Sequence, residues 1–252
     1  MHRTGRAPLP DLSPARRARS AVAPRTAWLL LALIATVLAA CAPTAREQAQ
    51  VTETPTGPLA YHPHPTGATW SYLPERASLD EGRVVTRVEG PTVLAGEVRT
   101  AWRLAGRGLD MRMFREHRSD GTYLVRTERP GTILRYDPPI FEMPDRELRV
   151  GDRWDGSTTV TTEFPDARSE NRFSVLDVDY VTTVVDRREV TVPAGTFEVF
   201  VLNFTTRTLD EDGEVTEEFT QERWFAPYLG LVRTEQDHFL LESNLIDLPR
   251  QP

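Results

Sequence analysis

The sequence predicts an all-β fold, a single antiparallel meander of about 10–11 strands with little helix. Three observations lead to this prediction. Apolar residues recur at every second position in several short runs, turn-forming residues separate the runs, and no stretch combines helical periodicity with helix caps. The 20 prolines and 15 glycines also oppose long helices, because both residue types destabilise a helix interior.

The clearest alternation occurs in two neighbouring runs. Trp102 and Leu104 stand at alternate positions of the first run, and Met111 and Met113 do so in the second. This period of two is typical of a strand with one buried face. Further strands are expected in runs rich in β-branched and aromatic residues, at 83–89, 122–128, 131–136, 157–164, 171–185, 187–192, 196–208, 214–225 and 229–241. The sequence also allows a short helix at 79–82 or 141–148.

The run at 197–204 is apolar on both faces. Its odd positions carry Phe197, Val199 and Val201, and its even positions carry Phe200, Leu202 and Phe204. A strand of this kind lies inside a sheet that is covered on both sides. Protein could cover both faces, or protein could cover one face while a ligand cavity covers the other.

The first 40 residues are predicted to be a signal peptide. Six arginines and one acid precede a run at 27–40 that is apolar except for Thr36. About 14 apolar residues are too few to span a bilayer, which needs roughly 20, so the run fits a signal peptide better than an anchor helix. The run ends in Leu38-Ala39-Ala40-Cys41, which resembles the lipobox of bacterial lipoproteins. Cleavage is therefore expected between Ala40 and Cys41, with a lipid attached to the thiol of Cys41.

Two absences limit the chemistry of the exported chain. Cys41 is the only cysteine, so lipidation leaves no thiol for a disulfide, a zinc-thiolate site or a cysteine nucleophile. All 30 basic residues are arginine, which excludes phosphate-loop NTPases and enzymes with a catalytic lysine.

The charge of the chain beyond residue 40 opposes two kinds of partner. This part carries 24 arginines against 36 acidic residues, a net charge of about −12. Nucleic acid is therefore not expected as a partner, and anionic headgroups should repel the domain. Attachment to a membrane then depends on the lipid at Cys41, and we expect a cell-envelope location on the extracytoplasmic side.

Composition divides the chain into four segments. A signal peptide at 1–40 precedes the lipidated cysteine and a flexible tether at 41–60, which is rich in Pro, Thr, Gln and Glu. A single β domain is expected at 61–248, and a disordered C-terminus at 249–252.

Three motifs in the β domain resemble a widespread group of bacterial secreted and lipid-anchored proteins with a domain of unknown function. The motifs are Tyr61 and a proline followed by Gly67, Trp70 and Tyr72; Val-Pro-Ala-Gly-Thr-Phe at 192–197; and Trp-Phe-Ala-Pro at 224–227 with Leu-Gly-Leu-Val at 229–232. The resemblance covers nearly the whole β domain. It implies a curved antiparallel sheet or open half-barrel like that of periplasmic lipoprotein carriers, and it implies no activity.

Several local patterns suggest chemistry, but each has a stronger structural interpretation. His62-Pro63-His64 lacks a third metal ligand, so a loop is favoured over a metal site. His117 lies near Asp120, but Asp120 is expected in a turn. His238 lies beside Asp237, but adjacent strand residues point to opposite faces. The acidic loop at 210–213 lacks the twelfth-position ligand of a calcium loop and is expected to be a hairpin turn. We predict no catalytic residue, metal ligand or cofactor.

The favoured function is a non-enzymatic module that binds a hydrophobic or amphiphilic ligand within the curved sheet. The candidate contacts are aromatic and methionine side chains, Trp102, Met111, Met113, Phe200, Phe204 and Trp224. One alternative is an envelope interaction or assembly protein without a small ligand. Another is a hydrolase that uses two carboxylates on neighbouring strands.

Overall fold

The computed structural model describes residues 55–56, 58–168 and 171–249. The predicted signal peptide, the cleavage site at Ala40 and the lipidation site Cys41 lie outside the described residues. The predicted tether lies mostly outside them. Leu59, near the end of the tether, is buried, and its amide donates to the carbonyl of Pro249 at 2.8 Å. Within the described residues, no helix is long and apolar enough to cross a membrane.

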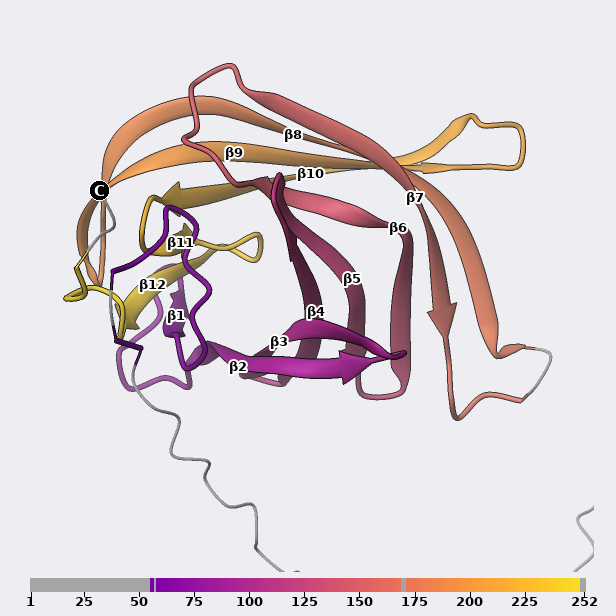
Figure 1. The fold of residues 1–252 in the computed structure, drawn as a ribbon, viewed down its shortest axis with the longest axis horizontal. Coiled ribbons are helices and arrows are strands. Elements are labelled where there is room, and N and C mark those ends of the chain that lie inside the picture. Colours follow the sequence, from indigo (N-terminus) through magenta and orange to yellow (C-terminus); the bar gives the residue numbers. More distant parts are fainter. Residues whose placement is uncertain (1–54, 57, 169–170, 250–252) are drawn as a thin grey trace, which may run out of the picture. The chain divides into compact units, whose positions relative to one another are not determined.

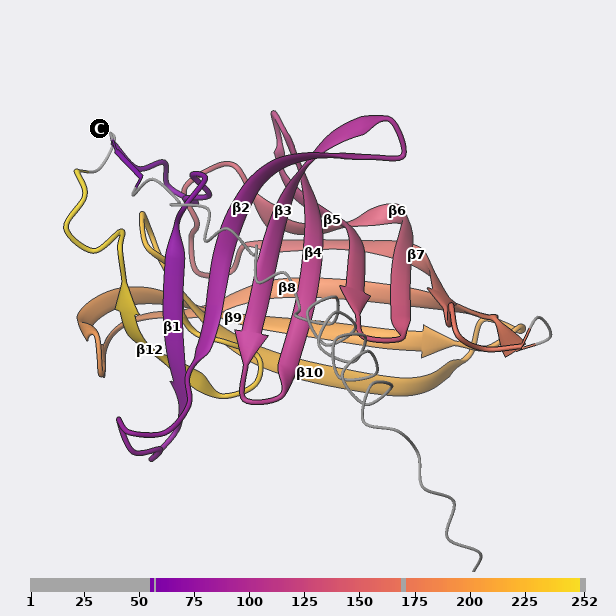
Figure 2. The same cartoon turned by 90° about the horizontal axis from the view of Figure 1, so that it is seen from below.

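The described chain is an antiparallel meander of twelve strands that closes into a barrel, with each strand paired to the next and β1 paired to β12 (Figure 1). Figure 2 shows β1 to β4 side by side, crossing the long strands β8, β9 and β10. The strands are β1 (Thr69–Pro74), β2 (Val84–Leu94), β3 (Glu97–Gly106), β4 (Leu109–Arg118), β5 (Gly121–Arg129), β6 (Thr132–Pro144), β7 (Arg153–Glu163), β8 (Phe173–Val192), β9 (Gly195–Leu209), β10 (Val215–Ala226), β11 (Gly230–Arg233) and β12 (His238–Ser243).

The predicted all-β antiparallel meander is confirmed, but the sheet closes into a barrel instead of remaining a curved sheet or open half-barrel, and its strand count and boundaries differ from the prediction. β1 was missed because it has only six residues, and its alternation of Trp70 and Tyr72 with polar neighbours stops at Leu73 and Pro74. The predicted runs 171–185 and 187–192 form one strand, β8, because a bulge between Val184 and Asp186 interrupts the period of two. The run 229–241 is two strands, because Asp237 adopts a left-handed φ of 56° in the turn between β11 and β12.

Neither short helix allowed by the sequence forms. Residues 79–82 lie in turns, residues 141–144 end β6, and residues 145–148 form a loop. The acidic loop at 210–213 is the hairpin turn between β9 and β10, as predicted. The Asp210 carboxylate accepts hydrogen bonds from the amides of Asp212 and Glu214, as in an Asx turn.

Aromatic side chains on β1 join the two ends of the meander. Trp70 Nε1 donates to the carbonyl of Leu229 at 2.6 Å, and Tyr72 Oη donates to the carbonyl of Leu231 at 2.9 Å. Gly230 lies between these two acceptors with φ of 102°, and a Cβ added there would lie 3.3 Å from the Trp70 indole nitrogen. Two of the sequence motifs therefore meet at the closure of the barrel.

Strand register identifies which side chains share a face of the sheet, because directly paired residues point the same way. Trp102 pairs with Met113, Met113 with Thr127, and this face continues around the barrel to Arg223 on β10. Arg115 on β4 and Arg223 on β10 both influence the pKa of Glu235, although six steps of the sheet separate the two strands. Glu235 belongs to the turn between β11 and β12, which lies within the ring of strands in Figure 1. The face carrying Trp102 and Arg223 is therefore the inner face.

The central part of β9 is buried on both faces, as its apolar pattern predicts. Phe200 and Leu202 point to the inner face, and Val199 and Val201 point to the other; all four are buried. The inner side contacts the cluster that contains Val184 and Phe225.

Replacing Gly230 with Ala should destabilise the barrel more than replacing Gly213 with Ala. Both glycines have positive φ, so each substitution carries a backbone penalty of roughly 1–2 kcal/mol. Only Gly230→Ala also places a methyl group against Trp70, whereas a Cβ at Gly213 meets open space. Urea unfolding should show an extra loss of about 1 kcal/mol for Gly230→Ala. Equal losses would mean that the contact with Trp70 does not support closure.

Candidate functional site

Five of the six side chains predicted to contact a ligand point to the inner face, where Trp102, Met111 and Met113 belong to one hydrophobic cluster and Phe200 to another. Trp102, Met111 and Met113 are neighbours on β3 and β4, since Trp102 pairs with Met113 and Leu104 pairs with Met111. Phe200 and Phe204 point to the same face from β9. Phe200 is buried, whereas Met111, Met113 and Phe204 are half-buried.

Trp224 packs against the same hydrophobic cluster as Trp102, Met111 and Met113, but strand register separates it from Phe200 and Phe204. It pairs with Val201, so it points to the face opposite Phe200 and Phe204. The guanidinium carbons of Arg188 and Arg233 lie 5.2 and 5.1 Å from its ring centroid, and its Nε1 donates to Glu222. These contacts, and the packing of Trp224 against the core cluster and Phe239, give Trp224 a structural role.

A partly buried ion pair lies beside the methionines on the inner face. Arg115 donates from Nε and Nη2 to the two carboxylate oxygens of Glu142, at 2.6 and 3.0 Å. Its guanidinium carbon lies 4.6 Å from the Trp102 ring centroid, which places the cation over the aromatic face. Arg115 is held by both contacts, and its side chain is only 14% exposed.

A second inner ion pair involves the turn between β11 and β12. Arg223 Nε lies 3.6 Å from Glu235 Oε2. Burial raises the pKa of Glu235, but Arg223 and local hydrogen bonds oppose this effect, and the net pKa shift is downward. A carboxyl group with a lowered pKa is unsuited to act as a general acid, which opposes the hydrolase alternative at this position.

Three histidines form a cluster on the inner face next to Arg115, which precedes His117 by two residues on β4. The rings of His64 and His117 stack with centroids 3.6 Å apart and an interplanar angle of 6°. Thr122 Oγ1 lies 3.1 Å from His117 Nδ1 and 3.5 Å from His62 Nδ1, and the His62 ring also contacts Phe225. The chain segment before β1 therefore enters the barrel and contacts β4, β5 and β10.

The histidine cluster is held neutral. Burial lowers the pKa of His62 to about 3, and the nearby His64, Arg115 and His117 lower it in the same direction. Burial likewise lowers the pKa of His117 to about 4, with contributions from His64 and Arg115. The pKa of His64 is also lowered, mainly by burial, against the opposing effects of its hydrogen bond to His62 and of Asp145.

Several buried nitrogen atoms on the inner face have no hydrogen-bond partner within the described residues. They are Trp102 Nε1, Arg115 Nη1, His117 Nε2, Trp154 Nε1 and Arg223 Nε. Buried polar atoms in native proteins are nearly always satisfied, so these atoms are exceptions, and a polar group that reached one of them would be stabilised. Tryptophan and arginine nitrogens are always donors, so the matching group must be an acceptor.

The acid/base and metal candidates do not assemble into a catalytic or metal-binding arrangement. Asp120 accepts from the Tyr123 hydroxyl and Asp237 accepts from Arg233, so neither is hydrogen-bonded to its neighbouring histidine. The rings of His64 and His117 are stacked and nearly parallel, so their nitrogen lone pairs lie in parallel planes. Two histidines that bind one metal ion instead point their lone pairs at a common point. Across the described ranges, no group of three or more His, Cys, Asp or Glu side chains could hold a metal ion.

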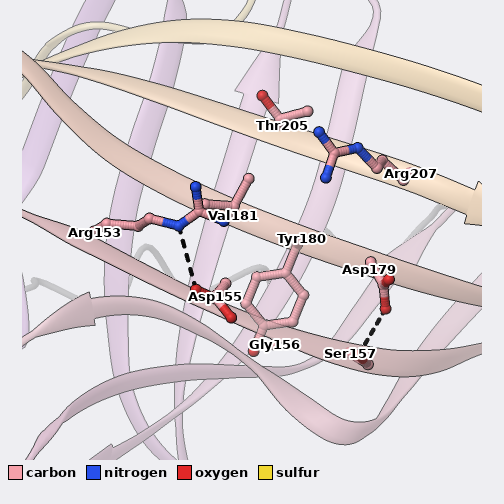
Figure 3. A pocket seen from close by; sticks show the side chains of 9 residues that line it. All are labelled: Arg153, Asp155, Gly156, Ser157, Asp179, Tyr180, Val181, Thr205 and Arg207. Carbon is pink, nitrogen blue, oxygen red and sulfur yellow. Dashed lines mark hydrogen bonds and ion pairs between the residues drawn. The ribbon is translucent and has the colours of Figure 1, made fainter.

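A shallow groove on β7, β8 and β9 offers less chemistry than the inner face (Figure 3). It is lined mainly by outward-pointing polar residues, Arg153, Asp155, Gly156, Ser157, Asp179, Tyr180, Val181, Thr205 and Arg207. Arg153 pairs with Asp155, and Ser157 donates to Asp179 at 2.6 Å. The lining includes no histidine, so Ser157 has no base of that kind to activate it.

The polar residues of the inner face were not predicted from the sequence. Met111, Met113, Arg115 and His117 are every second residue of β4, so Arg115 and His117 point inward like the two methionines. The signal that could have identified them is a charged residue at a strand position where the alternation expects an apolar residue. The contact of His64 with His117 bridges residues distant in sequence and has no local signal.

The low histidine pKa values predict that stability falls as the pH drops from about 6.5 towards 4. In this window the unfolded chain binds protons that the folded histidines do not, so the free energy of unfolding increases with pH. Each neutral histidine should contribute about 1–2 kcal/mol to the loss between pH 7.5 and pH 5. Guanidinium unfolding of the wild type and of the His62→Gln/His117→Gln variant at both pH values measures this. An equal loss in both proteins would contradict the assignment.

No family model and no curated protein matches the sequence. A solved structure of a protein assigned as a lipoprotein from Parabacteroides distasonis is 14% identical and covers 75% of this chain and 100% of its own, with a TM-score of 0.37. A solved structure of a protein assigned as exported, with a YmcC-like fold, from Bacteroides fragilis is 13% identical and covers 73% of this chain and 99% of its own, with a TM-score of 0.40. The chain is thus distantly similar in structure to two bacterial proteins with such assignments, and the likeness carries no inference about ligand or activity.

Proposed function

We propose that this protein is a lipid-anchored module on the extracytoplasmic side of a membrane, and that the inner face of its barrel binds a hydrophobic or amphiphilic ligand. The observation that carries the proposal is the composition of that face. Half-buried Met111, Met113 and Phe204 lie on the same face as buried donors that have no partner. Ligand sites are typically apolar with a few convergent polar groups.

The exposure of inward-pointing side chains supports access to this face. A barrel filled by its own side chains would bury them, yet Met113, Tyr136 and Phe204 remain half-buried. Further along the inner face, near the ends of β8 and β10, Leu176 is 47% and Phe219 is 56% exposed. Apolar side chains of the inner face are therefore exposed to solvent near these strand ends, which supports access by an apolar ligand.

Lipid attachment at Cys41 complements this function. A ligand with an acyl chain is concentrated in the bilayer and scarce in water, so a binding module benefits from being held at the membrane surface. The net charge of about −12 would keep the domain itself away from anionic headgroups, and the acyl anchor would supply the attachment.

An envelope interaction protein is the second candidate, because apolar residues are also exposed on the outer face. Phe173 and Val175 on β8 and Val215 on β10 are 55%, 59% and 52% exposed. Their register partners place all three on the face opposite Phe204. Exposed apolar groups of this kind often contact a partner protein.

A neutral apolar probe should distinguish the two candidates. We expect N-phenylnaphthylamine to bind the Cys41→Ser chain with a rise in probe fluorescence. Met113→Gln, on the inner face, should weaken this binding about fivefold, because it places an amide in an apolar site. Val175→Gln, on the outer face, should leave binding unchanged.

Thermal unfolding of both variants controls for loss of fold. If the folded protein fails to bind the probe, or if Val175→Gln and Met113→Gln weaken binding equally, the inner face is not the binding surface. Such a result would favour the interaction protein.

Replacing Cys41 with Ser should release the protein from the membrane fraction without unfolding the barrel, because the acylated residue lies outside the β domain. Thr44→Ser, which keeps the thiol, should remain in the membrane fraction. Fractionation and immunoblotting measure the distribution of both variants. Retention of Cys41→Ser with the membranes after a salt wash would contradict lipid anchoring.

A further inference from the structure

We propose that the ligand of the inner face is an amphiphile with an anionic head, and that Trp102, Arg115 and His117 form its head-group site. This inference rests on the proposed function, since it names the chemical class of the ligand bound there. The same head-group site would accept a carboxylate or a phosphate, because both are anionic acceptors that match a guanidinium.

The three side chains lie on the same face of two neighbouring strands. Arg115 lies over the Trp102 ring, with 4.6 Å between the guanidinium carbon and the ring centroid. His117 follows Arg115 by two residues on β4 and therefore points to the same face. Each of the three retains a buried nitrogen without a hydrogen-bond partner in the described part of the chain.

The donors indicate the chemistry of the head. Trp102 is only 8% exposed, and its Nε1 can only donate. Arg115 uses Nε and Nη2 for Glu142 and keeps Nη1, which also can only donate. Two obligate donors, one of them charged, favour an acceptor with negative charge over a neutral hydroxyl or an ammonium group.

The existing ion pair sets the strength of this site. Glu142 neutralises much of the charge of Arg115, so a ligand anion competes with Glu142 for the guanidinium. Removal of the Glu142 charge should therefore strengthen anion binding, whereas removal of Arg115 should weaken it. A purely structural ion pair would not produce opposite effects on ligand affinity.

The apolar contacts adjoin the head-group site and account for the tail. Met113 is the register partner of Trp102, and Met111 follows on the same face. An acyl chain could therefore contact thioether side chains directly beyond a head bound at Arg115. Polar donors next to flexible apolar groups are a suitable combination for one amphiphile.

The experiment compares ligands that share a sixteen-carbon tail and differ only in the head. Hexadecanoate, hexadecyl phosphate and hexadecanol are titrated by displacement of N-phenylnaphthylamine from the Cys41→Ser chain. The additional substitutions are Arg115→Met, Glu142→Gln and Arg126→Met. Arg126 is the matched control, because it lies on the adjacent strand β5 and points to the outer face with Phe114.

We expect the anionic ligands to bind at least tenfold more tightly than hexadecanol. Arg115→Met should weaken anion binding 10- to 100-fold and leave hexadecanol within twofold, because only the charged contact is lost. Glu142→Gln should tighten anion binding several-fold, and Arg126→Met should change nothing. A preference for hexadecanoate or for hexadecyl phosphate would separate a fatty acid from a lipid phosphate as the ligand.

Two contrary outcomes have different meanings. Equal binding of all three ligands, with no effect of Arg115→Met or Glu142→Gln in folded protein, would overturn the head-group site while the proposed function stands. If none of the ligands displaces the probe, or if the probe itself does not bind, the proposed function and this inference both fail. Thermal unfolding of each variant shows whether Arg115→Met has lost its fold, and Glu142→Gln provides the independent test in that case.

Discussion

Closure of the meander by β1 is the constraint on which the rest of the structure depends. β1 lies between β2 and β12, and its Trp70 and Tyr72 donate to the carbonyls of Leu229 and Leu231. An antiparallel sheet left open would expose two unpaired edges, whereas a closed barrel has none. Closure also separates an inner from an outer face, so successive side chains of each strand point alternately into and out of the barrel.

The inner environment explains why polar groups there differ from those outside. Most surface ion pairs of this protein are exposed to water and contribute little to stability. Arg115 and Glu142 are shielded instead, and each would be costly to bury without the other. The same shielding keeps His62 and His117 neutral and leaves Trp102 with an unused donor. A face that combines such donors with methionines is suited to a molecule with both polar and apolar parts.

The sequence allowed the fold class, most strand positions and the inward direction of Trp102, Met111 and Met113 to be predicted, because these follow from a period of two. It could not show which of the adjacent residues Trp224 and Phe225 points inward, since both are large and aromatic; register places Phe225 there. Closure depends on side chains that donate to carbonyls about 160 residues away, at distances that no local pattern encodes. The histidine cluster was missed for the same reason, because its contacts join the segment before β1 to β4, β5 and β10, which are distant in the sequence.

The central claim is that the inner face holds a ligand rather than only its own side chains. A crystal structure of the protein purified from its native envelope without added ligand tests this most directly. We expect electron density for an extended apolar chain beside Met113 and Phe204, with its polar end within hydrogen-bond distance of Arg115 Nη1. An interior in which side chains close over Met113 and leave no space for a chain would contradict the claim.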